Sequence, residues 1–398
     1  MKKLIQYTIL LLICLTPVFG IVEVLTFLGQ ESSIDILYYK LPKDILLGLI
    51  TIFSIIRIFR NGYPNRLAPY LFTLTVFTLL VFLLSSSNLL TSVAGLRWSL
   101  PFFILFLLVD VIDSKFVTKI SDVLAWIIVL NLAVQIHQML NMSAIRGFNQ
   151  FGLAGRVSGF FSNSSAAGVL GCFTFYIIRY FSESRKILTN FYLICSVLSI
   201  IVSMSSTGVA ILLLILIIPY FLRSNIKSLL VFLVAPVILI VFANLDFLTG
   251  RSQGDSAISF STRMSIFADQ ISKAQLISLR FGEATNTAVN FSRKLNIQQD
   301  SFISDSLYTS ILTNYGWLFF TIFSIVLYKC LRKTIESKDE GQIVFFTICF
   351  LSSFPIITTE NFPINMLISL LGAYYIKLHK KRSLLESRQR FDYRSSHA

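Results

Sequence analysis

Charged residues are scarce in this chain, and their scarcity excludes most classes of soluble protein. Of the 398 residues, 14% are charged and 55% are hydrophobic, and the mean hydropathy is +0.74. Soluble domains usually carry about 25% charged residues. Apolar runs of roughly 20 residues, the length that a helix needs to cross a bilayer, recur along the chain. The composition therefore predicts a protein that crosses a membrane many times.

Histidine and cysteine are also rare, and their positions argue against a metal centre and against disulfides. The chain has three histidines and five cysteines. His137 stands alone near the outer end of a predicted span, while His379 and His397 follow the last span. No two cysteines form a Cys-x-x-Cys pair, and no Asp-x-Asp motif lies on the predicted outer face. We therefore expect neither a metal nor another cofactor.

The apolar runs predict an all-α integral membrane protein of about twelve transmembrane helices, with both termini on one side. Most of the 34 lysines and arginines fall on the side of the termini, which the positive-inside rule assigns to the cytoplasm. This asymmetry accounts for the net charge of +14, so no nucleic-acid partner is expected. We expect the spans to begin near Leu4, Lys43, Leu67, Leu96, Ile120, Ser165, Phe191, Thr207, Leu229, Leu307, Gln342 and Phe362.

The same pattern divides the chain into four parts. Residues 1–248 hold helices 1–9, residues 249–306 form one long periplasmic loop, residues 307–378 hold helices 10–12, and residues 379–398 form a basic cytoplasmic tail. In the long loop, the spacing of apolar residues predicts a helix that Ser259 or Ser261 caps. That start places Arg263 in the first turn, where the helix dipole disfavours a cation unless an anion is bound.

Arginines gather at the predicted outer face, close to helix N-termini. Arg97 opens the fourth helix in AGLRWSLP, and Arg156 precedes the sixth in GRVSGFFSNSS, where Asn163 can cap the helix. Arg263 and Arg280 belong to the long loop. A guanidinium group pairs with two phosphate oxygens, and a helix N-terminus attracts anions. These residues are candidates for binding a lipid-linked pyrophosphate; the alternative for each arginine is an anchor to lipid headgroups.

Three carboxylates are candidates for a catalytic base at the same face. Asp305 opens the tenth helix in SDSLYTSIL, Glu283 lies in LRFGEATN, and Glu360 precedes the twelfth helix in TTENFP. A carboxylate beside cations stays ionised and can accept a proton from a sugar hydroxyl. For Asp305 the alternative is a structural role at the helix N-terminus.

Four segments, in this order, resemble motifs of the O-antigen polymerase and ligase superfamily, which includes Wzy-type polymerases and WaaL-type ligases. GLRWSLP resembles the arginine at the start of a central helix, and GRVSGFFSNSSAAGVL resembles R-x-x-G-x-F-x-N-x-N-x-x-A with Ser165 at the second Asn. STRMSIFADQISKAQLISLRFGEA is similar to an R-x-x-x-W/F stretch before a glycine. SDSLYTSILTNYGWLFF is similar to H-N-x-Y-L-x-x-L-x-x-x-G, with Asp305 where ligases have histidine. That departure favours a polymerase over a ligase.

The resemblance implies a metal-independent, inverting glycosyltransferase of the bacterial inner membrane that acts in lipopolysaccharide or surface polysaccharide biosynthesis. An enzyme of this kind joins repeat units carried on undecaprenyl pyrophosphate at the periplasmic face. The implied partners are this lipid-linked oligosaccharide, the bilayer, a chain-length regulator and a flippase. Two alternatives stay open: an O-antigen or other surface-polymer ligase, and a lipid-linked oligosaccharide flippase or another transporter. We expect a flippase to hold its cations at mid-membrane depth, unlike the arginines of this chain.

Overall fold

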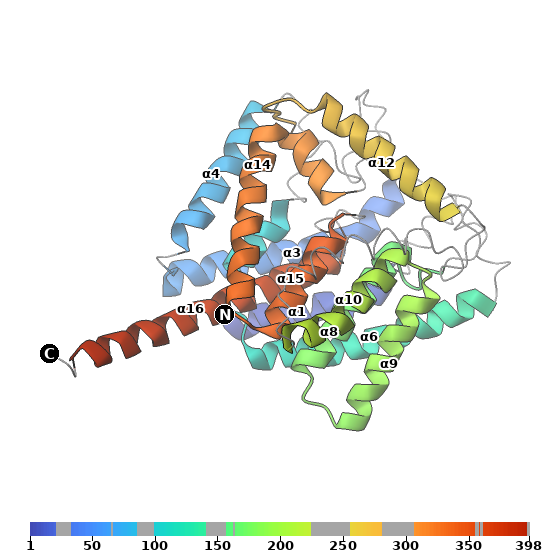
Figure 1. The fold of residues 1–398 in the computed structure, drawn as a ribbon, viewed down its shortest axis with the longest axis horizontal. Coiled ribbons are helices and arrows are strands. Elements are labelled where there is room, and N and C mark those ends of the chain that lie inside the picture. Colours follow the sequence, from blue (N-terminus) through green and yellow to red (C-terminus); the bar gives the residue numbers. More distant parts are fainter. Residues whose placement is uncertain are drawn as a thin grey trace.

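The fold is helical throughout the part of the chain that the structure describes. The computed structural model describes residues 1–20, 33–64, 67–85, 99–140, 157–161, 164–223, 255–280, 306–354, 358 and 361–395, and every regular element in them is a helix, as predicted. Residues 99–107 are helical in addition to the labelled helices of Figure 1. The labelled helices are α1 (Lys2–Cys14), α3 (Ser33–Asn61), α4 (Ala68–Leu84), α6 (Ser114–Leu140), α8 (Ser164–Phe181), α9 (Lys186–Val202), α10 (Ser206–Arg223), α12 (Asp255–Lys273), α14 (Leu307–Glu336), α15 (Glu340–Ser352) and α16 (Ile364–Ser395).

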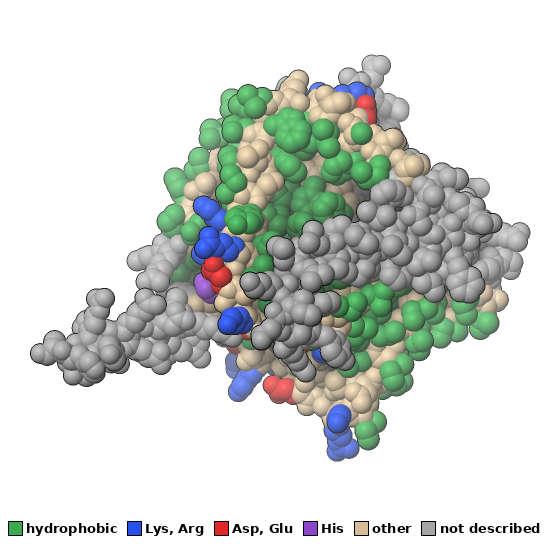
Figure 2. Space-filling view, in the orientation of Figure 1, with side chains coloured by type: hydrophobic (Ala, Val, Ile, Leu, Met, Phe, Trp, Pro, Cys, Tyr) green, Lys and Arg blue, Asp and Glu red, His purple; other side chains and the backbone are tan. Residues whose placement is uncertain are grey.

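Two of the described helices, α6 and α14, are long and apolar enough to cross a bilayer, judged by length and composition. Helices α4, α9 and α15 are apolar but shorter. Large hydrophobic side chains lie exposed on several helices; on α4, Phe72 is 70% exposed and Leu83 74%. Figure 2 shows hydrophobic side chains over much of the described surface, with charged side chains in small groups. Exposed apolar surface of this extent marks contact with a membrane or with another protein.

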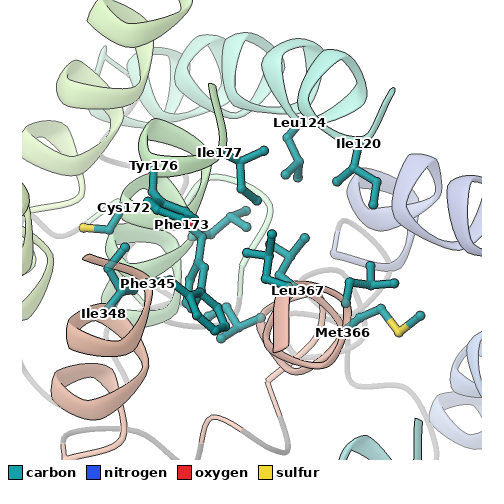
Figure 3. Packing of buried hydrophobic residues seen from close by; sticks show 14 of the residues in the cluster. Ile120, Leu124, Cys172, Phe173, Tyr176, Ile177, Phe345, Ile348, Met366 and Leu367 are labelled. Atoms are coloured by element: carbon teal, nitrogen blue, oxygen red, sulfur yellow. The ribbon is translucent and has the colours of Figure 1, made fainter. Parts of the chain in front are cut away.

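Helix α8 lies at the centre of the bundle, because almost its whole circumference is buried. It packs against α6, α9, α10, α15 and α16. Figure 3 shows Phe173 and Tyr176 of α8 near Phe345 of α15, while Ile177 of α8 lies toward Leu124 of α6. Aromatic rings that are fully buried in this way supply much of the packing area of a core.

Glycines let α8 and α10 approach each other closely. A Cβ atom on Gly208 would lie 2.9 Å from the Cα atom of Gly168, a distance that a larger residue cannot keep. Small residues serve the same purpose between transmembrane helices generally. The N–H of Gly208 also donates to the Ser205 hydroxyl at 3.1 Å, so Ser205 caps α10.

The start of α1 and residue 377 of α16 lie at the same end of the bundle. Lys2 Nζ donates to Asp113 Oδ2 at 2.6 Å, and Lys377 Nζ donates to the carbonyl oxygen of Ile112 at 2.8 Å. Partial burial raises the pKa of the Asp113 carboxyl, but the Lys2 ammonium, the N–H of Phe116 and the charge of Lys377 outweigh it. The pKa of Asp113 is therefore held below its ordinary value.

The helix expected in the long loop is present as α12, but the predicted start was wrong. It begins at Asp255, so Ser259 and Ser261 lie inside it and Arg263 lies about two turns from its beginning. Acidic residues are favoured in the first turn of a helix by its dipole, and the sequence has Asp at the first position of α12. The dipole acts mainly within the first turn, so the expected conflict with Arg263 does not arise.

Candidate functional site

Helix α14 is broken at Gly316, where φ is 81° and ψ is −178°. This left-handed φ is readily adopted only by glycine. A break in a helix frees backbone N–H and C=O groups, which must find other partners when no water reaches them. In α14 these groups are taken up by residues 274–280, which follow α12 and are called the docked segment below.

Four backbone hydrogen bonds hold the docked segment against the break. They are Trp317 N to Gln275 O at 3.0 Å, Leu318 N to Leu276 O at 3.0 Å, Ser278 N to Tyr315 O at 3.2 Å and Arg280 N to Asn314 O at 3.0 Å. A Cβ atom on residue 316 would lie 2.7 Å from Gln275 O and 2.8 Å from Ser278 N. The close approach of the two backbones therefore requires glycine at position 316.

A cavity of about 230 Å³ lies where α12, the docked segment and α14 meet. Two cations line it, Lys273 and Arg280, and Lys273 Nζ pairs with Asp269 at 2.9 Å. The Oγ1 atom of Thr313 is buried and has no hydrogen-bond partner among the described residues. The full lining consists of Gln270, Lys273, Ala274, Gln275, Ser278, Arg280 and Thr313. These groups can bind an anionic, hydroxyl-rich ligand.

The turn at residues 157–161, the described part of the GRVSGFFSNSS motif, is buried and held by amides of α6. Gln138 bonds to both backbone groups of Gly159: its Nε2 donates to the carbonyl at 3.0 Å, and the Gly159 N–H donates to Oε1 at 2.8 Å. The N–H of Phe160 donates to Asn131 Oδ1 at 3.0 Å. Gly159 has φ 62°, and a Cβ atom there would overlap Asn131. The backbone of this turn is thus held by two side chains of α6, Gln138 at Gly159 and Asn131 at Phe160.

The amides of α6 also join it to α9 through Ser199. Ser199 Oγ donates to Gln135 Oε1 at 2.7 Å, and Asn131 Nδ2 donates to Ser199 Oγ at 3.1 Å. This network was not predicted from the sequence. The pattern that indicates it is the recurrence of Asn131, Gln135 and Gln138 on one face of an apolar helix, where unpaired polar groups are costly.

The start of α14 is tied to the end of α15. Ser306 caps α14 with its side chain and donates from Oγ to the carbonyl of Ser353 at 3.1 Å. The hydroxyls of Ser353 and Thr358 lie 3.1 Å apart. Because Ser306 is the cap, the helix does not need Asp305 for that role. Ser306, which follows Asp305 in sequence, and Thr358, which is close to Glu360 in sequence, therefore both contact Ser353.

The helical stretch at residues 16–20 contacts both the buried turn and the beginning of α16. The rings of Phe19 and Phe362 pack edge to face with centroids 6.1 Å apart. Gly20 lies so close to Phe160 that a Cβ atom would overlap the Phe160 carbonyl oxygen. The turn before α8 and the beginning of α16 are thus held together at one end of the bundle.

The structure describes two of the predicted site residues. Arg280 is half-buried and lines the cavity, and Arg263 lies in α12 with its side chain outside the described part. Sequence analysis did not select Lys273, because a lysine at the exposed end of an amphipathic helix is usually solvated. The remaining predicted residues, Arg97, Arg156, Asn163, Glu283, Asp305 and Glu360, lie outside the described residues.

Within the described ranges, no three His, Cys, Asp or Glu side chains gather in a way that could hold a metal ion. Comparison of the chain with protein-family models, with curated proteins and with solved structures found no match. Any assignment of function therefore depends on the residues and their geometry.

Proposed function

We propose that this chain is a polysaccharide polymerase of the bacterial inner membrane, with twelve spans, both termini in the cytoplasm and the long loop in the periplasm. The long apolar helices α6 and α14 and the exposed hydrophobic surface support the membrane location. The contacts of Lys2 and Lys377 with residues 112–113 support the placement of both termini on one side.

The observation that carries the proposal is that the docked segment, within the long loop, is bonded to the helix that follows Asp305. Arg280 donates its N–H to the carbonyl of Asn314 at 3.0 Å, and Ser306 caps the same helix. The half-helix between these two points spans about 12 Å, at about 1.5 Å per residue. The cation Arg280 is thus bonded to one end of this half-helix, and the candidate base Asp305 directly precedes the cap of its other end in sequence.

In the proposed reaction, a hydroxyl of one lipid-linked repeat unit attacks the anomeric carbon of the glycan on a second lipid. The new C–O bond forms as the bond to pyrophosphate breaks, and the electron pair leaves with undecaprenyl pyrophosphate. Direct displacement inverts the anomeric centre. Asp305, or else Glu283 or Glu360, accepts the proton of the attacking hydroxyl.

The arginines of the outer face stabilise the leaving group in this reaction. Arg156 and Arg263, with Arg97 or Arg280, bind the pyrophosphate and offset the charge that develops on it, so no metal is needed. Asn163 directly precedes α8 in sequence, and the free N–H groups at the start of a helix can bind the same anion. The buried turn that follows Arg156 in sequence is held by Gln138.

The test is a deletion strain complemented with Arg156→Ala, Arg263→Ala or Asp305→Asn, with surface polysaccharide resolved by length. The matched control is Arg332→Ala, which removes an exposed arginine of α14 that pairs with Glu336. A polymerase loses long chains but keeps single repeat units on the core. Loss of single units as well indicates a ligase or flippase, and normal ladders from all three variants refute the site assignment.

A further inference from the structure

The cavity between α12, the docked segment and α14 has a charge that restricts its ligand. Among the described residues, Lys273 and Arg280 bring two positive charges, and Asp269, paired with Lys273 at 2.9 Å, removes one, which leaves +1. A ligand group of charge −1 complements this balance. A pyrophosphate group carries more negative charge and would lie close to the Asp269 carboxylate, which repels it.

The uncharged part of the lining indicates what surrounds the charged group of the ligand. The uncharged polar residues of the lining are Gln270, Gln275, Ser278 and Thr313. Thr313 Oγ1 is buried without a hydrogen-bond partner among the described residues, a state that a bound ligand relieves. The volume of about 230 Å³ corresponds to roughly seven water molecules at about 30 Å³ each. That is room for one sugar ring.

We propose that this cavity binds a single sugar residue that carries a carboxylate, such as a hexuronic acid. The guanidinium group of Arg280 pairs with the carboxylate through two parallel hydrogen bonds. Thr313 and Ser278 bond to the ring hydroxyls. Naming a sugar as the ligand rests on the proposed function, whereas the charge and size rest on the cavity alone. Because Arg280 then binds the carboxylate, the pyrophosphate is left to Arg156 and Arg263 with the other candidate, Arg97.

Binding to the purified full-length chain in detergent micelles tests this assignment without turnover. Saturation-transfer NMR is recorded with free glucuronate, with glucose as the neutral control and with inorganic pyrophosphate as a competitor. Thr313→Val removes a hydroxyl that bonds to no described residue and keeps the branched shape of the side chain. Arg280→Gln removes the cation, and Arg332→Gln, at an exposed arginine elsewhere on α14, is the matched control.

We expect glucuronate to bind at least tenfold more tightly than glucose. Thr313→Val and Arg280→Gln each weaken glucuronate binding about tenfold, and Arg332→Gln leaves it unchanged. Equal binding of the two sugars, no glucuronate binding, displacement by pyrophosphate at equal or lower concentration, or unchanged binding in both cavity variants overturns the inference.

The two proposals fail separately. If the polysaccharide ladder behaves as proposed but glucuronate does not bind, only the acidic-sugar inference is wrong. If glucuronate binds as expected but the ladders stay normal in the Arg156, Arg263 and Asp305 variants, the proposed function is wrong and the ligand of the cavity stands.

Discussion

The side-chain amide of Gln138 and the backbone of Gly159 form a two-point hydrogen-bonded pair, at 3.0 and 2.8 Å, between the apolar helix α6 and the turn before α8. A polar side chain within an apolar helix is costly unless it is paired. Here the pairing satisfies both backbone groups of a residue that has no other regular partner. The pair therefore fixes the turn that follows Arg156.

Gly159→Ala should destabilise the protein more than a similar change at Gly62. Both glycines have positive φ, 62° and 76°, but a Cβ atom at 159 overlaps Asn131 whereas position 62 has open space. We expect a loss of about 3 kcal/mol or more for Gly159→Ala and about 1 kcal/mol for Gly62→Ala. Thermal unfolding in detergent measures both, and equal shifts of the midpoint would contradict the described packing.

Ser199→Ala and Ser121→Ala should differ although both remove a buried hydroxyl. Ser199 bonds to Asn131 and Gln135, while Ser121 Oγ has no partner among the described residues. The first change leaves amides unpaired and should cost about 1–3 kcal/mol. The second removes an unpaired buried hydroxyl and should leave stability unchanged or raise it by about 1 kcal/mol. Equal midpoints in detergent unfolding would show that the network does not form.

Gly316→Ala should release the docked segment from α14. The added Cβ atom meets the backbone of Gln275 and Leu276 at 2.7 and 2.8 Å, so the segment has to move away. Trypsin cleaves after Lys273, which precedes the docked segment, and after Arg280, which is its last residue. We expect cleavage at these two sites to be severalfold faster in Gly316→Ala. Gly48→Ala, in open space on α3, is the control. An unchanged digestion pattern for Gly316→Ala would refute the docking.

The Lys2–Asp113 pair should stabilise the protein at neutral pH but not in strong acid. The pKa of Asp113 is lowered in the folded state, so its contribution is present above the ordinary carboxyl pKa and is lost as the pH falls through the lower, folded value. Both side chains are partly exposed, so the contribution is about 1 kcal/mol or less. The midpoint of Asp113→Asn should lie below that of the unaltered protein at neutral pH and meet it in acid. A gap of the same size at both pH values contradicts the pairing.

Local signals in the sequence predicted where helices begin better than how they end or break. α14 begins at Leu307 and α8 one residue before the predicted Ser165, because a capping residue and an apolar run mark each beginning. The break at Gly316 could not be predicted in the same way, since it depends on backbone partners in residues 275–280, far away in sequence. The role of Gln138 was hidden for the same reason, because Gly159 lies on a separate segment.

The candidate site was predicted only in outline. The arginine-rich outer face led to Arg280, which lines the cavity, but nothing local indicated that Lys273 joins it or that Thr313 faces the same space. These residues come together only because α14 is broken and the docked segment fills the break. The sequence shows the chemistry of single residues, whereas their assembly depends on long-range backbone pairing.

Reconstituted polymerisation tests the central claim most directly. The purified chain is placed in lipid vesicles with an undecaprenyl-pyrophosphate-linked repeat unit, and the lengths of the lipid-linked glycans are measured. The account predicts products of two or more repeats, with one undecaprenyl pyrophosphate released for each bond formed, and their loss in Asp305→Asn. Glycans that stay at one repeat, whether or not the lipid moves across the bilayer, would contradict it.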